Sequence, residues 1–117
     1  MIETGAWDDV VVFTMSDFGR TLADNGDGTD HGWGSHQFVF GGSVVGNRIY
    51  GDLPILDPDA SNFTKSRARL IPSIAVEQYA ATLGSWFGLD AGAIDQVLPN
   101  LGRFDARDLG FLGGAAV

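Results

Sequence analysis

The chain has 117 residues, which is enough for one domain with a hydrophobic core and too few for two independent ones. Fifteen acidic residues against seven Lys and Arg give a formal net charge of -8, which argues against nucleic acid and against anionic membranes as partners. The absence of cysteine excludes disulfides, thiolate metal sites and a cysteine nucleophile.

The first predicted element is a strand in the N-terminal segment MIETGAWDDVVVFTMSD. Its longest apolar run, Val10 to Phe13, is far too short for a signal-peptide core or a membrane span, and the segment has no basic region. The β-branched run instead predicts a strand from Val10 to Ser16 that is buried on both faces. Such strands lie in sheets covered by helices, so we expect an α/β fold with no membrane segment and no export signal in the sequence as printed.

Residues 19–36 are rich in glycine and acids, and the sequence NGDG favours turns with positive φ. We therefore predict a long loop here, of the kind that is often functional in compact domains. The sequence HQFVFGGSVVGNRIYG then predicts a strand at Gln37–Phe40 and a further strand at Val44–Tyr50. Residues 51–70, with two prolines and mixed charges, are expected to be irregular and exposed.

The last third of the chain is predicted to be helical. Apolar residues recur at helical spacing after Ser73, which we expect to cap the helix, and Gly88 is expected to end it; the periodic residues are Val76, Tyr79, Ala80, Leu83, Trp86 and Phe87. The two aromatic residues at the end of this pattern are predicted to lie in the core. A shorter helix is predicted at Ala91–Val97, with Asp90 as its cap and Pro99 beyond its end.

Four side chains in or beside the predicted loop are candidate metal ligands: Asp17, Asp30, His31 and His36. Carboxylate oxygen and imidazole nitrogen both suit divalent ions, so zinc, manganese and calcium are the candidate metals. Asp17 follows a predicted strand, at the edge of an α/β sheet where sites are usually assembled. The alternative is a solvated turn in which Asp30 and His31 bind no ion.

Two further residues of the loop are candidates for binding. Arg20 is a candidate anion-binding residue because a guanidinium group can hold a phosphate, sulfate or carboxylate by two contacts, although the composition favours its pairing with one of the many nearby acids. Trp33 could line a pocket for a carbohydrate ring. A small calcium or carbohydrate module is the least favoured interpretation, since NGDG does not place oxygen ligands at EF-hand spacing and no Glu closes the loop.

Three segments carry a family resemblance. In this order, VVVFTMSDFGRT, GTDHGWGSHQFVFGGSVVGNRIYG and SIAVEQYAATLGSWFGLD, followed by VLPNLGRF and LGFL, resemble the C-terminal part of a bacterial family known as domain of unknown function 1501. That family in turn resembles the alkaline phosphatase and sulfatase superfamily of metal-dependent hydrolases. The resemblance implies a partial three-layer α/β/α sandwich, with residues 1–117 forming a single partial domain that is the C-terminal segment of a longer parent.

The resemblance also implies roles for the candidate ligands. Asp17 matches the acid of the superfamily's S-D-H-G element, but Phe18 stands where many members have His. Asp30, His31 or His36 are the candidates to replace that ligand, and the alternative is an altered or empty site. Either histidine could match the later histidine of the superfamily. The segment that carries the nucleophile in the superfamily has no counterpart here, so we expect no catalysis by this chain alone.

The resemblance has consequences for location and partners. Family members usually begin with a twin-arginine export signal, which implies a periplasmic or secreted parent, although this chain shows no such signal. A strand that has lost its sheet neighbours would expose an edge or an apolar face, which a homo-oligomer or the missing N-terminal half would cover. Two functions stay open: part of a metal-dependent phosphate or sulfate ester hydrolase, or a non-catalytic interaction domain whose Gly-rich loop is only a solvated connection. The two differ in whether the Asp and His side chains converge.

Overall fold

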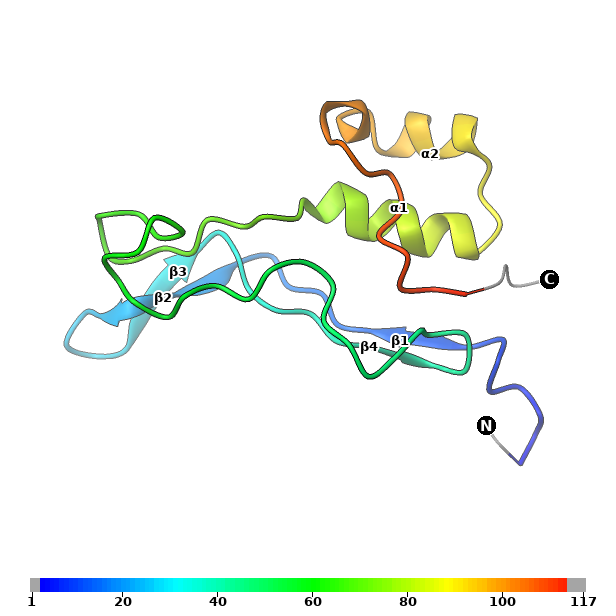
Figure 1. The fold of residues 1–117 in the computed structure, drawn as a ribbon, viewed down its shortest axis with the longest axis horizontal. Coiled ribbons are helices and arrows are strands. Elements are labelled where there is room, and N and C mark those ends of the chain that lie inside the picture. The colour runs from blue at the N-terminus through cyan, green and yellow to red at the C-terminus, as the bar shows by residue number, and fades with distance from the viewer. Residues whose placement is uncertain (1–2, 114–117) are drawn as a thin grey trace. The chain divides into compact units, whose positions relative to one another are not determined.

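The computed structural model describes residues 3–113 (Figure 1). They divide into two compact units. The described residues of Met1–Phe13, Val39–Tyr50 and Ile74–Val117 form the first, and Thr14–Phe38 with Gly51–Ser73 form the second. The presence of both helices and strands confirms a mixed α/β composition. Each sheet of the described residues has two strands; the single partial domain and the three-layer sandwich stay predictions.

The first unit contains a two-stranded ribbon. Strand β1 (Val11–Phe13) pairs antiparallel with β4 (Val39–Gly41), which places Val12 opposite Phe40. The predicted strand at Gln37–Phe40 is thus confirmed with a shift of its ends, whereas the prediction of a strand at Val10–Ser16 buried on both faces is wrong. The strand is shorter, and Val12 and Phe13 are exposed, because the pattern of a buried strand leads to burial only where other elements cover both faces.

The prediction of a strand at Val44–Tyr50 is also wrong. Val44 forms an isolated antiparallel bridge with Leu112, and the chain then turns at Asn47, whose φ is 57°. The Tyr50 hydroxyl donates to the Val45 carbonyl at 2.8 Å. The segment therefore folds back on itself, because Gly46 and Asn47 favour a turn over an extended conformation.

Three helical elements complete the first unit: α1 (Val76–Trp86), α2 (Ala91–Val97) and the 3₁₀ helix η1 (Leu101–Arg103). The helix α2 runs beside α1 in Figure 1, and Ala81, Ile94 and Leu101 form the core between these elements. The prediction for α2 is confirmed at both ends. Its cap is also confirmed, since the Asp90 carboxylate accepts a hydrogen bond from the Ala93 N–H at 2.8 Å.

For α1, the predicted start is wrong and the predicted end is confirmed. The N-cap is Ala75, not Ser73, and the Gln78 side chain accepts a hydrogen bond from the Ala75 N–H at 3.0 Å. This side chain satisfies the backbone N–H of the N-cap residue, which is the contribution that the N3 residue makes to a capping box. At the other end Gly88 has φ 102°, and the Leu89 N–H donates to the Gly84 carbonyl at 2.9 Å. This Schellman motif confirms the predicted end at Gly88.

The buried face of α1 is partly polar. Gln78, Ala81, Thr82 and Trp86 are buried, which confirms the core position of Trp86. The prediction for Phe87 is wrong, since its side chain is 77% exposed. Phe87 directly follows Trp86, so its side chain lies about 100° further around the helix axis, away from the buried face of α1.

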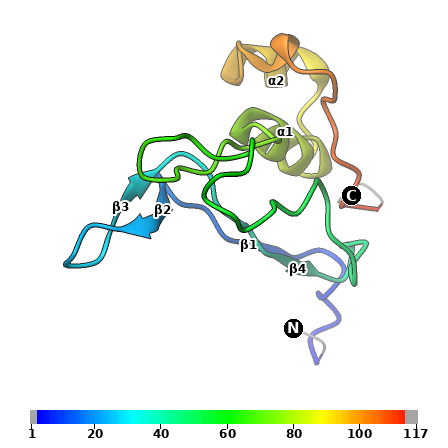
Figure 2. The ribbon, with the colours of Figure 1, turned by 60° about the vertical axis from the view of Figure 1, so that its left-hand side comes forward.

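The second unit contains a β-hairpin in place of the long loop predicted over residues 19–36, and that prediction is wrong. Strand β2 (Gly19–Asp24) pairs antiparallel with β3 (Thr29–Gly32), as Figure 2 shows. The predicted positive φ values are confirmed in the connecting turn, at 92° for Gly26 and 149° for Gly28. The glycines thus shape a tight turn between strands, because an Asn-Gly sequence is a hairpin signal when extended segments flank it.

The rest of the second unit is irregular, as predicted for residues 51–70. An isolated bridge joins Phe63 to Leu70, and Phe63 and Ala68 are buried. The Leu22 N–H donates to the Ala68 carbonyl at 3.0 Å, which attaches this segment to β2. Within residues 3–113, none of the helices has the length and apolar character needed to cross a bilayer.

Candidate functional site

The predicted site residues all lie in the second unit. Asp17 precedes β2, Arg20 is on β2, Asp30 and His31 are on β3, and His36 follows β3. Asp30 is half-buried and the other four are exposed. The pairing of the two strands therefore places Arg20 and His31 opposite each other, while Asp30 is the neighbour of His31 along β3.

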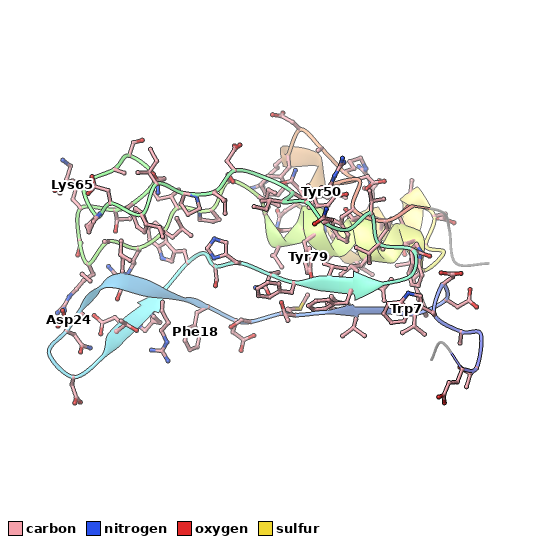
Figure 3. All side chains as sticks on the ribbon, turned by 60° about the horizontal axis from the view of Figure 1, so that its bottom comes forward. Trp7, Phe18, Asp24, Tyr50, Lys65 and Tyr79 are labelled. Atoms are coloured by element: carbon pink, nitrogen blue, oxygen red, sulfur yellow. The ribbon has the colours of Figure 1, made fainter. Side chains whose placement is uncertain are left out.

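Arg20 and His31 lie directly opposite each other in the ladder, so their side chains share a face of the hairpin. Phe18 joins them: the Arg20 guanidinium carbon lies 5.2 Å from the centre of its ring, and the His31 ring meets it edge-on at 6.2 Å. Figure 3 shows Phe18 projecting from this part of the ribbon. The Arg20 Nη1 also donates to the Thr29 carbonyl at 2.9 Å. An aromatic ring and a backbone oxygen thus hold the guanidinium group in place.

Asp30 has different neighbours. Its Oδ1 accepts a hydrogen bond from the Asn25 Nδ2 at 2.7 Å, and its Oδ2 lies 3.5 Å from the Arg67 Nε. Its backbone N–H donates to the Thr21 hydroxyl at 3.1 Å. Both carboxylate oxygens of Asp30 therefore already have a nitrogen partner within the unit, and the arginine that pairs with this acid is Arg67 and not Arg20.

The neighbours of Asp30 and His31 follow from strand geometry. Successive side chains of a strand point to opposite faces, so Asp30 is directed toward Asn25 and Arg67 while His31 is directed toward Phe18. Across residues 3–113, no three His, Asp or Glu side chains come together in a group that could hold a metal ion. The metal site at Asp17, Asp30, His31 and His36 stays a prediction.

Arg67 forms an ion pair with Asp30, and no pattern in the sequence predicted this partner. It and Ala68 adopt left-handed backbone conformations, with φ values of 64° and 46°, which are costly for residues other than glycine. Ala68 is buried and its carbonyl accepts from Leu22. Nothing in the residue types of SRAR signals this conformation, and the partner of Asp30 could be found only once the segment was placed against β2.

The ribbon of the first unit presents a second notable surface. Val12 and Phe40 lie opposite each other and are 53% and 54% exposed. On the other face Phe13 meets Tyr79 of α1 edge-on, with ring centres 6.2 Å apart; Figure 3 shows Tyr79 between α1 and the ribbon. Burial raises the pKa of the Tyr79 hydroxyl. The helix thus covers one face of the ribbon, and Val12 and Phe40 form an apolar patch on the other, named here the ribbon patch.

The first unit also has a hollow of about 150 Å³. Small-molecule sites usually have roughly 300–1,000 Å³, so this hollow is smaller than a typical ligand pocket. Its wall is mostly the small and apolar residues of the helical core, with three polar side chains at its edge: Ala81, Leu89, Ala91, Ile94 and Leu101 with Ser85, Arg107 and Asp108. Arg107 forms an ion pair with Asp95.

Comparison with known proteins identifies one family. The family described as "Protein of unknown function (DUF1501)" matches residues 1–101. No curated protein and no solved structure matches the chain.

Proposed function

The chain belongs to the DUF1501 family of proteins of unknown function, and we propose that it acts as a non-catalytic interaction domain that binds an extended segment of another polypeptide at its β1–β4 ribbon. The observation that carries this proposal is the ribbon patch, in which Val12 and Phe40 lie opposite each other and are each about half exposed. Two-stranded ribbons are marginally stable alone and gain from a third strand.

The large number of exposed apolar side chains supports the proposal that the chain binds a partner. Among residues 3–113, seven apolar side chains are buried, whereas nineteen large apolar side chains are exposed. Burying a Val or Phe side chain fully is worth roughly 1.5–3 kcal/mol, so covering the exposed half of Val12 and Phe40 contributes on the order of 2 kcal/mol. This is too little for tight binding, and the rest must come from main-chain hydrogen bonds along a strand edge, as in β-strand addition.

The negative charge of the chain indicates which kind of polypeptide can bind to the ribbon patch. The formal net charge of -8 applies to every copy of the chain, and like charges oppose the association of two copies. Asp8 and Asp9 lie shortly before β1, with Val10 between them and the strand. The partner is therefore a different polypeptide, with β-forming apolar residues on one face and Lys or Arg on the other.

A synthetic peptide that alternates Val and Lys tests this proposal. Calorimetry should show binding to the chain that is lost in Val12→Lys and retained in Phe87→Lys, because Phe87 is exposed on the same unit but lies outside the ribbon. Sedimentation of the chain alone should give a monomer. A dimer that Val12→Lys dissociates would point to a second copy as the partner, and a monomer that does not bind the peptide would overturn the proposal.

A second candidate is part of a metal-dependent phosphate or sulfate ester hydrolase, resembling the alkaline phosphatase superfamily and not catalytic alone. It is supported by the position of Arg20, Asp30 and His31 on one hairpin. Asp17, Asp30, His31 and His36 would supply oxygen and nitrogen ligands to zinc, manganese or calcium, and Arg20 would bind the anionic group of the ester. Rotation of the side chains or further ligands from elsewhere would be needed to complete such a site.

Calorimetric titration with each of the three metals tests the second candidate. We expect micromolar binding that is lost in His31→Ala and in Asp30→Asn and kept in Asp59→Asn, which removes a carboxylate of the same unit outside the hairpin. Absence of binding to the unmodified chain, or equal loss in the control, would rule out the metal site.

A further inference from the structure

The turn between β2 and β3 contains an Asn-Gly sequence, Asn25-Gly26, and both residues are exposed. Asparagine side-chain amides can react with the backbone nitrogen of the next residue, and glycine in that position leaves the nitrogen open because it has no side chain. The chain has three other asparagines, Asn47, Asn62 and Asn100, none of which is followed by glycine. They provide an internal comparison.

Three hydrogen bonds surround the reacting atoms of this pair. The Gly26 N–H, whose nitrogen would attack, donates to the Asp24 Oδ1 at 2.9 Å. The Asn25 Oδ1, where negative charge would develop, accepts from the Asp27 N–H at 3.0 Å. The Asn25 Nδ2, which would leave, donates to the Asp30 Oδ1 at 2.7 Å. A base, an oxyanion donor and an anchor for the leaving group thus stand around one amide, each at hydrogen-bond distance.

We propose that Asn25 is a self-modification site at which the chain converts its own asparagine to aspartate and isoaspartate. The Gly26 nitrogen loses its proton to the Asp24 carboxylate and forms a bond to the Asn25 Cγ, and the electron pair of the C=O bond moves to Oδ1 beside the Asp27 N–H. The oxyanion then collapses, the Cγ–Nδ2 bond breaks, and the amide group takes up the proton and leaves as ammonia. The product is a five-membered succinimide ring.

Water completes the reaction. It adds to one of the two ring carbonyls and opens the ring, which gives aspartate at position 25 or isoaspartate, in which the main chain runs through the side-chain carbon. The net change is one water consumed and one ammonia released, with no oxidation or reduction. The step is intramolecular, so its reacting atoms are held close without any binding event.

The modification would change the region around Asp30. The amide of Asn25, which donates to the Asp30 carboxylate, would become a carboxylate in a turn that already holds Asp24 and Asp27. Like charges at this distance repel, and isoaspartate would lengthen the backbone of a turn in which the Asn25 N–H donates to the Gly28 carbonyl at 2.9 Å. The turn would loosen and Asp30 would keep Arg67 as its partner.

Peptide mapping by mass spectrometry of the purified chain after incubation at neutral pH tests the proposal. We expect conversion at Asn25, seen as the mass gain of amide to carboxyl and as isoaspartate fragments, while Asn47, Asn62 and Asn100 stay unconverted over the same time. An unchanged Asn25, or conversion at the other asparagines at a similar rate, would overturn it.

Two variants test the assigned atoms. Asn25→Gln should abolish conversion at position 25, because its ring would need six members and closes more slowly. Asp24→Ala should slow conversion by about a hundredfold, the lower end of what a positioned base contributes. Amide hydrogen exchange of β2 and β3 checks that the hairpin persists in each variant. Conversion that is as fast or faster in Asp24→Ala with an intact hairpin would show that Asp24 restrains the turn and would overturn its role as the base.

Discussion

The hydroxyl group of Thr82 on α1 accepts a hydrogen bond from the backbone N–H of Leu109 at 2.9 Å. The same hydroxyl donates to the Gln78 carbonyl at 2.8 Å, and Thr82 is only 2% exposed. One buried side chain thus connects the segment that follows η1 to the helix, and both of its hydrogen-bonding directions are used.

Replacing Thr82 with Val keeps the shape of the side chain and removes this connection. Because the Leu109 N–H would lose its acceptor in a partly buried position, we expect the free energy of unfolding to fall by about 1–3 kcal/mol. Urea unfolding monitored by tryptophan fluorescence measures the change. Thr82→Ser, which keeps the hydroxyl and removes the methyl group, should cost clearly less. An unchanged free energy of unfolding in Thr82→Val, or a larger loss in Thr82→Ser, would contradict the stabilising role of these hydrogen bonds.

Leu101 is the most completely buried large side chain of the helical core, at 0% exposure. Leu101→Ala should lower the free energy of unfolding by about 2–5 kcal/mol, because it loses apolar burial and leaves a cavity between the helices. Val97→Ala is the control, since Val97 on the neighbouring helix is exposed and should change stability by less than about 0.5 kcal/mol. Similar losses in both variants would contradict the position of the core.

Gly19 at the start of β2 lies against the backbone of Gly34. A Cβ atom at residue 19 would stand 1.9 Å from the Gly34 carbonyl oxygen, so Gly19→Ala must displace backbone and should destabilise the hairpin by about 1–3 kcal/mol. Amide hydrogen exchange in β2 and β3 reports this locally. Gly102→Ala, where a Cβ atom meets nothing within 4 Å, should leave exchange in the hairpin unchanged. Normal protection of the hairpin in Gly19→Ala would disprove the close approach.

Tyr79 gives the fold a dependence on alkaline pH. Burial raises the pKa of its hydroxyl above the usual value of about 10. The folded chain therefore favours the neutral form: this contribution is fully present below pH 10 and is lost as the pH rises through the raised pKa. The unfolding free energy of the unmodified chain should fall in that range, and Tyr79→Phe should remove part of the decrease. The same decrease in the variant would mean that other groups cause it.

The elements that local sequence determines were predicted well. The helix Ala91–Val97 and the end of α1 at Gly88 depend on a cap and on a residue with positive φ, which are visible in a few consecutive residues. The prediction for Phe87 is wrong because the apolar pattern of α1 is wider than the face that the core covers. The loop prediction is wrong because the glycines and acids of residues 19–36 favour a loop, whereas the segments on either side of Asn25-Gly26 pair with each other.

The residue types of the candidate site could be predicted from the sequence, but the arrangement of these residues in space could not. Residue types identified Asp30, His31 and Arg20, yet the opposite directions of Asp30 and His31 depend on their being in a strand. Arg67, which pairs with Asp30, comes from a distant and irregular segment whose left-handed backbone no motif announces. An exposed edge or apolar face was expected of a strand without its sheet neighbours, and a strand at Gln37–Phe40 was predicted, but the pairing of Val12 with Phe40 required the structure.

The most direct test of the interaction-domain account is amide hydrogen exchange across β1 and β4, measured with and without the alternating Val-Lys peptide. The account predicts that the peptide slows exchange in these two strands, and that the β2–β3 hairpin keeps its original rate. Slowing confined to the hairpin, or no slowing at peptide concentrations that saturate calorimetric binding, would contradict it.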